Sequence, residues 1–285
     1  MTKATTKLRE LLARPETLLA PFTYDGFTAR IAEEAGFDAV YMSGFGTSMS
    51  KGIPDVGLLS QTEMIENAAY IVEAVSVPVL ADADTGYGNA INVGRTIRQY
   101  ERAGVAGVHI EDQVAPKKCG FFDGKMVIEM DEAARKIQAA VEARSDDDFV
   151  VIARCDALVV NGWDDVERRC RAYVNAGADL VFVDGIRTAD DLAEFASRLN
   201  DLPRMYNGEL PPTDVASAGF KIQIHRGPVF ALYPIIKEMM VELKEKGEIS
   251  AMSRWGTGGA LRMDIANALG LERITELEQR YATSG

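Results

Sequence analysis

Eight short apolar runs, separated by amphipathic stretches, constrain the fold of this chain more than any other feature. Most runs are rich in β-branched residues, and most of the spacers are long enough for a helix. Fully apolar strands that alternate with helices are typical of a parallel sheet whose two faces are both covered. Eight such units favour a closed (β/α)8 barrel of the TIM type over an open, doubly wound sheet. The runs are 18–22, 39–43, 77–82, 107–111, 149–154, 180–184, 204–207 and 221–225.

The spacers are expected to form the helices of this barrel. Residues 89–104 repeat apolar side chains at three- and four-residue spacing and end on Gly104, the residue type that commonly follows a helix. Because no linker marks a boundary, we expect one barrel domain over residues 1–285, with a C-terminal helical extension from about 247 to 285. Further helices are expected over 164–177, 188–199 and 228–247.

Composition excludes several classes of partner. The 43 acidic and 31 basic residues give a net charge of −12, and no basic run offers a nucleic-acid patch. The same charge argues against anionic membrane surfaces, and no apolar window approaches the roughly 18 residues of a membrane span. The start of the chain lacks the apolar core of a secretory signal. We therefore expect a cytoplasmic protein without nucleic-acid or membrane partners.

The cysteine and histidine counts limit the metal chemistry. Three cysteines, none in a CxxC pair, cannot build a disulfide framework without leaving one over, and we expect Cys155 and Cys170 to be structural. With only two histidines, a zinc site made of His and Cys ligands is disfavoured. Any metal is therefore expected to be a hard cation held by carboxylates.

Polar residues follow most of the apolar runs, at the strand ends where a parallel barrel carries its chemistry. Asp82 and Asp84 are two residues apart and so point to the same side of an extended chain, and Glu111 ends the next run. Three neighbouring carboxylates repel one another unless a cation neutralises them, and oxygen ligands suit Mg²⁺ or Mn²⁺. We predict a Mg²⁺ site here, against the alternative of an aspartate pair that caps the next helix.

A basic loop and a strand-end arginine complete the candidate machinery. Lys117 and Lys118 precede Cys119, and adjacent cations favour the thiolate, which can act as a nucleophile or in acid–base catalysis. The alternative is a solvated basic loop with an incidental cysteine. Arg154 ends an apolar run, where a buried cation needs an anionic partner, and we favour a substrate carboxylate over a rim carboxylate. His109 lies inside a run and is expected to pack in the core.

Several segments, in order, resemble the isocitrate lyase/phosphoenolpyruvate mutase superfamily over nearly the whole chain. Within it, the chain looks most like the lyases of 2-methylisocitrate and 2,3-dimethylmalate and the carboxyphosphonoenolpyruvate mutase-like members. The resemblance implies a (β/α)8 barrel whose C-terminal helix exchanges between the subunits of a homotetramer. The matching segments are Ala35-Gly36-Phe37, Tyr41-Met42-Ser43-Gly44, Pro54-Asp55-Val56-Gly57, Ala81-Asp82-Ala83-Asp84-Thr85-Gly86-Tyr87-Gly88-Asn89, His109-Ile110-Glu111-Asp112-Gln113 and Lys117-Lys118-Cys119-Gly120.

The resemblance also implies roles for individual residues. It implies that Asp82, Asp84 and Glu111 hold Mg²⁺, partly through water. It further implies that Cys119, on a mobile loop, protonates the carbanion that leaves when a C–C bond is cleaved. Catalytic roles are implied for Asp55, Lys118, Cys119 and Arg154, and substrate contacts for Ser43, Gly44, Phe45, Gly120, Asp184 and Asn207.

The expected activity is therefore that of a Mg²⁺-dependent carbon–carbon lyase. Its substrate would be a small anionic 2-hydroxy di- or tricarboxylate, and its products a 2-oxo acid and a carboxylate. The alternatives are a phosphonomutase of the carboxyphosphonoenolpyruvate type and a hydrolase of an oxaloacetate-like acid. Several departures from the usual lyase pattern predict altered recognition of the substrate's far end. Among them, Phe121 stands where histidine is usual, and Asp184 where a glutamate is expected.

Overall fold

The structure, a computed structural model, describes residues 2–120, 122–250 and 259–282. The chain divides into two compact units, Met1–Pro228 and Val229–Gly285. This division falls inside the helix expected over 228–247. The expectation of one barrel domain with an extension from about residue 247 stays a prediction. The departure at Phe121 lies outside the described residues.

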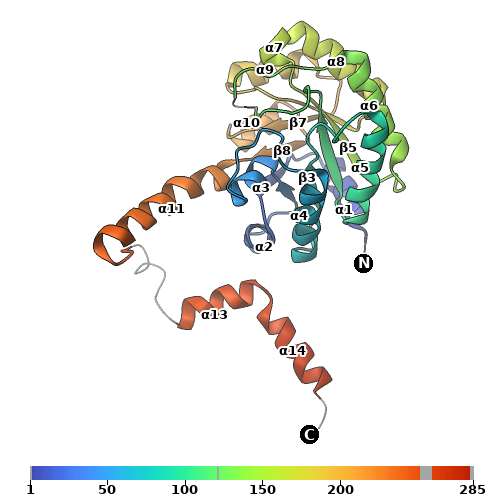
Figure 1. Ribbon diagram of the computed structural model, residues 1–285. Coiled ribbons are helices and arrows are strands. Elements are labelled where there is room, and N and C mark those ends of the chain that lie inside the picture. The colour runs from blue at the N-terminus through green and yellow to red at the C-terminus, as the bar shows by residue number, and fades with distance from the viewer. Residues whose placement is uncertain (1, 121, 251–258, 283–285) are drawn as a thin grey trace. The chain divides into compact units, whose positions relative to one another are not determined.

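The first unit is a closed barrel of eight parallel strands, which confirms the predicted fold class. The strands pair in chain order, and β8 pairs with β1 to close the ring. Figure 1 shows this ring surrounded by its helices. The strands are β1 (Leu18–Thr23), β2 (Val40–Met42), β3 (Val79–Asp82), β4 (Gly107–Glu111), β5 (Val150–Cys155), β6 (Leu180–Val183), β7 (Arg204–Asn207) and β8 (Ile222–His225).

Helices follow the strands where the amphipathic spacers predicted them. Several begin with a capping box, in which the side chains of the cap residue and of the residue three positions later bond each other's backbone N–H. Asn89 caps α5 in this way and Thr188 caps α9. The helices are α1 (Ala4–Ala13), α2 (Gly26–Glu34), α3 (Gly44–Ser50), α4 (Gln61–Ala74), α5 (Ala90–Arg102), α6 (Met130–Ala143), α7 (Leu158–Asn161), α8 (Trp163–Asn175), α9 (Ala189–Arg198), α10 (Pro212–Ser217) and α11 (Gly227–Lys246).

The core lies between the strands and their covering helices. Val108, Val151 and Val181 are fully buried, each on a different strand, against helix residues such as Ile97 and Tyr173. Because adjoining strands are parallel and in register, their carboxyl ends reach the same rim. The register pairs Glu111 with Arg154 and Asp82 with His109, so the polar strand ends become neighbours.

The second unit consists of the rest of α11 together with α13 (Gly259–Ala268) and α14 (Leu271–Tyr281). Its helices carry exposed apolar side chains, among them Tyr233, Ile236 and Met240 on α11. An exchange of helices between subunits would bury such side chains, and this exchange stays a prediction. Within the described ranges, no helix combines the length and apolar character that a membrane span requires.

Candidate active site

The two aspartates of the predicted metal site lie on the turn that leaves β3. Asp82 ends β3, and Asp84 follows in a left-handed conformation with φ 45°. Non-glycine residues in this conformation are strained and cluster at functional sites. The Asp82 carboxylate accepts hydrogen bonds from the backbone N–H of Asp84 (2.9 Å) and of Gly44 (3.2 Å). A Cβ on residue 44 would lie 2.5 Å from Oδ2 of Asp82, so only glycine lets the start of α3 come this close.

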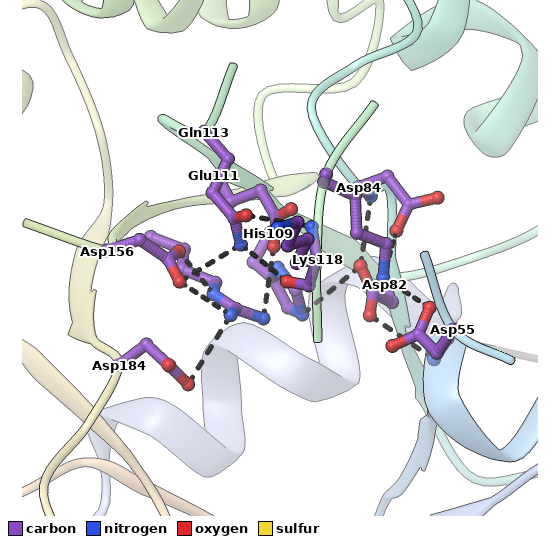
Figure 2. A network of polar contacts seen from close by, with 12 residues as sticks. Asp55, Asp82, Asp84, His109, Glu111, Gln113, Lys118, Asp156 and Asp184 are labelled. Carbon is purple, nitrogen blue, oxygen red and sulfur yellow. Dashed lines mark hydrogen bonds and ion pairs between the residues drawn. The ribbon is translucent and has the colours of Figure 1, made fainter. Parts of the chain in front are cut away.

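Lys117 ties this turn to the segment that precedes α4. Its Nζ lies 2.5 Å from Oδ1 of Asp55 and 2.9 Å from Oδ1 of Asp84. Figure 2 shows Asp55 beside Asp82 and Asp84. Burial lowers the pKa of Lys117, but the surrounding carboxylates outweigh burial and hold that pKa well above its ordinary value. Lys117 is therefore a buried cation that compensates the charge of the acidic rim.

The loop that carries Cys119 is held largely through its backbone. Cys119 is 8% exposed, and its N–H donates to the Asp55 carbonyl (3.0 Å). Gln113 exchanges two hydrogen bonds with the backbone of Lys118, each 2.9 Å long. Nζ of Lys118 donates a hydrogen bond to the Asp123 carbonyl (3.2 Å). The fold thus brings Cys119 to the rim beside Asp55.

Arg154 is surrounded by rim carboxylates. Its guanidinium makes a bidentate pair with Asp156, through Nε–Oδ2 (2.8 Å) and Nη2–Oδ1 (2.9 Å). Nη1 lies 3.1 Å from Oε2 of Glu111, and Nη2 lies 3.4 Å from Oδ1 of Asp184. Figure 2 shows Glu111, Asp156 and Asp184 within one network of polar contacts. Rim carboxylates therefore already pair Arg154, and its contact with a substrate carboxylate stays a prediction.

His109 packs inside the barrel, as predicted. It is 1% exposed, and its Nε2 is linked to the Tyr41 hydroxyl at 2.6 Å. Oδ1 of Asp82 lies 3.7 Å from the same nitrogen. Burial, only partly offset by Asp82, lowers the pKa of His109 to about 4. The ring is therefore neutral at pH 7 and lies beside Asp82 without adding a charge.

Three of the predicted substrate-binding residues, Ser43, Asp184 and Asn207, lie at or just after the ends of strands. Ser43 caps α3, since its Oγ accepts a hydrogen bond from the Gly46 N–H (3.1 Å), and Phe45 follows in the first turn of that helix. Asn207 ends β7, and its Oδ1 is buried without a hydrogen-bond partner among the described residues. A buried acceptor with no donor is costly, and a donor on a bound ligand would satisfy it.

The donor set at the strand ends fits a hard divalent cation. Burial raises the pKa of Asp84 to about 6, opposed by Lys117, and burial also raises the pKa of Glu111 well above its ordinary value. Among the described residues neither buried carboxylate oxygen of Glu111 accepts a hydrogen bond, although Oε2 lies in ion-pair contact with Arg154. A cation would relieve these costs. Within the described ranges, however, no group of three or more His, Cys, Asp or Glu side chains is close enough to form a complete inner shell.

Four residues organise this site without having been predicted as site residues: Lys125 and Asp156, which sequence reasoning did not select, and Lys117 and Gln113, which it noted only as parts of motifs. Asp156 is fully buried and accepts hydrogen bonds from Gln113 (3.1 Å), Lys125 (3.1 Å) and Arg154. One signal was available, because Asp156 stands two residues after Arg154 on an extended segment and therefore shares its side.

The arrangement is that of a TIM-barrel enzyme, with chemistry gathered at the carboxyl ends of the strands. Residues 8–243 match the family model described as phosphoenolpyruvate phosphomutase. The 2,3-dimethylmalate lyase of Eubacterium barkeri is 40% identical, over 97% of this chain and 98% of that protein.

Two solved structures have the same fold. An oxaloacetate acetylhydrolase in complex with 3,3-difluorooxalacetate has a TM-score of 0.92 and 34% identity, covering 99% of this chain and 98% of that one. A phosphonopyruvate hydrolase in complex with oxalate and Mg²⁺ has a TM-score of 0.88 and 31% identity, covering 98% and 99%. The chain belongs to the phosphoenolpyruvate mutase/isocitrate lyase superfamily, and it is an enzyme of that superfamily.

Proposed function

We propose that this chain is a Mg²⁺-dependent carbon–carbon lyase. It would cleave a substituted 2-hydroxy di- or tricarboxylate, resembling 2,3-dimethylmalate or 2-methylisocitrate, into a 2-oxo acid and a carboxylate. The observation that carries the proposal is the position of Cys119. Its backbone N–H is bonded to Asp55, and the preceding Lys117 contacts both Asp55 and Asp84, so a thiol lies beside the acidic rim. The 2,3-dimethylmalate lyase similar over nearly the whole chain supports the same activity.

The metal would be held by Asp82, Asp84 and Glu111, partly through water, and Mn²⁺ would serve in place of Mg²⁺. When bound, such a cation supplies a Lewis acid that lowers the pKa of the substrate hydroxyl. The buried carboxylates of Asp84 and Glu111, which burial disfavours as anions, support this assignment. The Mg²⁺ complex of the similar phosphonopyruvate hydrolase supports it as well.

The chain's own side chains would bind the substrate and supply the final proton. Arg154 and the segment Ser43-Gly44-Phe45 would grip the substrate carboxylates, the arginine by charge-assisted hydrogen bonds. As the deprotonated hydroxyl becomes a carbonyl, the C–C bond breaks and its electron pair stays on the leaving carbon. Cys119 would then donate its thiol proton to that carbon, which completes the carboxylate product.

Two alternatives are chemically close to this proposal. A hydrolase of an oxaloacetate-like acid is favoured by the likeness to oxaloacetate acetylhydrolase. A phosphonomutase of the carboxyphosphonoenolpyruvate type would use the same metal site and a similar Lys-Lys-Cys-Gly loop.

One screen separates these activities. The full chain is incubated with Mg²⁺ and, in turn, 2,3-dimethylmalate, 2-methylisocitrate, isocitrate, oxaloacetate and phosphonopyruvate. Products are followed by mass spectrometry and by a 2-oxo acid assay, with EDTA and Cys119→Ser as controls. We expect the hydroxy acids alone to be turned over, each with the appearance of a new 2-oxo acid, and only with Mg²⁺ and with Cys119 present. Turnover confined to oxaloacetate or to the phosphonate would reject the lyase in favour of the corresponding alternative.

A further inference from the structure

Lys125 lies near the C-terminal end of the loop that carries Cys119, where the chain pairs with the residues that begin this loop. Gln113 and Val127 form an antiparallel bridge, and the Val114 N–H donates to the Met126 carbonyl at 2.8 Å. The loop between these paired ends carries Cys119. Its ends are fixed, and its tip is held both by the Cys119–Asp55 backbone hydrogen bond and by the surface on which Gly120 rests.

The Lys125 side chain is 2% exposed and holds two carboxylates that come from different strand ends. Its Nζ lies 2.8 Å from Oδ2 of Asp184, after β6, and 3.1 Å from Oδ1 of Asp156, after β5. The other oxygen of Asp184 lies 3.4 Å from Arg154. Two cations therefore fix Asp184, and one of them belongs to the Cys119 loop itself.

Asp184 is the surface on which the loop tip rests. A Cβ on Gly120, the residue after Cys119, would overlap the Asp184 carboxylate, with both carboxylate oxygens within 2.7 Å of it. Glycine is therefore required at position 120 for a steric reason. The backbone beside Cys119 is packed directly against the carboxylate that Lys125 orients.

We propose that Lys125 is a positioning residue that, by fixing the Asp184 carboxylate under Gly120, sets the closed position of the Cys119 loop. The proposal rests on the proposed function only in taking Cys119 as the proton donor. It assigns to Asp184 the role of a docking surface for the loop, in place of the substrate contact that the family resemblance implies. The ion pair is buried, so its loss removes one of the two cations that fix the Asp184 carboxylate and leaves the loop tip on a less firmly held support.

Alkylation of Cys119 tests the proposal without any substrate. The full chain is treated with iodoacetamide, and the modification of each cysteine is followed by peptide mass spectrometry. Cys155 and Cys170 are 0% exposed and report general loosening of the barrel in the same sample. A thiol that reacts only when the loop opens is modified in proportion to the open population.

We expect Lys125→Met to raise the alkylation rate of Cys119 at least tenfold while Cys155 and Cys170 stay protected. Lys125→Arg, which keeps the buried cation, is expected to stay within about threefold of the wild-type rate. Gly120→Ala should raise the alkylation rate of Cys119 as Lys125→Met does, because the new methyl group displaces the loop tip from Asp184. The matched control is Lys3→Met, which removes a lysine–aspartate pair of similar length (3.1 Å) on the surface and should change nothing.

An unchanged alkylation rate of Cys119 in both Lys125→Met and Gly120→Ala would overturn the proposal. Equal acceleration at all three cysteines in both variants would overturn it too, since the barrel itself would then be loosened. Protection of Cys119 that depends on Lys125, in a chain that fails the lyase screen, would support the positioning role and reject the proposed function. The experiments can therefore reject either proposal without rejecting the other.

Discussion

Arg154 and Asp156 form a bidentate ion pair two residues apart at the end of β5, with contacts of 2.8 and 2.9 Å. Residues i and i+2 of an extended strand share a side, which makes so short a connection possible. The pair fixes the plane of the guanidinium, so that Nη1 reaches Glu111 while Nη2 reaches Asp184. A site built on Arg154 therefore depends on an acid that sequence reasoning did not select.

Asp156→Ala is expected to weaken both the fold and the site. Arg154 and Lys125 would lose a shared, fully buried partner, and breaking a buried ion pair from one side costs about 3–5 kcal/mol of unfolding free energy. Urea denaturation followed by circular dichroism measures this loss. Asp201→Ala, which removes the exposed partner of Arg171, is the control and should leave the midpoint unchanged. Equal midpoints for the two variants would argue against Asp156 as the centre of this network.

Cys119→Ser should abolish C–C cleavage and still bind the 2-oxo acid product. A serine hydroxyl is a far weaker acid than a thiol, so we expect kcat to fall by at least about 10² while product affinity changes little. Turnover assays and titration calorimetry measure the two quantities. Cys170→Ala, on the buried face of α8, removes another buried cysteine and should keep the activity within a few-fold of the wild type. Full activity of Cys119→Ser would remove the cysteine from the mechanism.

Asp84→Ala should remove the dependence on Mg²⁺ together with the activity. Asp84 is one of three proposed ligands, and its removal also takes from Lys117 one of two carboxylate partners. Calorimetric titration with Mg²⁺ should show binding to the wild type and affinity weakened at least about tenfold in the variant. The control is Asp123→Ala. Asp123 accepts the hydrogen bond from Lys118 through its backbone carbonyl, which the substitution keeps. Metal-stimulated turnover in Asp84→Ala would place the cation elsewhere.

The buried His109 predicts a loss of stability in acid. Burial lowers its pKa to about 4 in the folded chain from an ordinary 6.5, so between these values the unfolded chain binds more protons. The unfolding free energy should therefore fall as the pH drops from 7 to 4, by roughly 3 kcal/mol from this group. Thermal melts in EDTA over that range, compared for the wild type and His109→Gln, measure the slope.

His225→Gln is the matched control for this pH dependence, because the His225 ring is partly exposed at the end of β8. The acid-dependent loss should persist in that variant and shrink in His109→Gln. A slope that is the same in both variants and in the wild type would mean that His109 is not the group responsible.

The barrel and the position of its acids were predictable because they depend on local pattern. Apolar runs define strands, and residues that end parallel strands meet at one rim whatever the details of packing. Asp82 and Glu111 were located in this way, and both prove to be buried at the ends of β3 and β4. The burial of His109 followed from its place inside an apolar run.

The loop after β4 could not be predicted to the same depth. Nothing local distinguishes Lys117 from Lys118, yet Lys117 is buried between two aspartates while Nζ of Lys118 donates to the nearby Asp123 carbonyl. The role of Lys125 depends on the return of the chain at Val127, a contact that periodicity does not reveal.

The sequence by itself determined the barrel, its polar rim and the chemical types available there: carboxylates, cations and a thiol. Only the tertiary structure decided which cation meets which carboxylate. The physical reason is that strand and helix periodicity act over a few residues, whereas an ion pair such as Lys125–Asp184 joins groups 59 positions apart through a loop that has no periodicity.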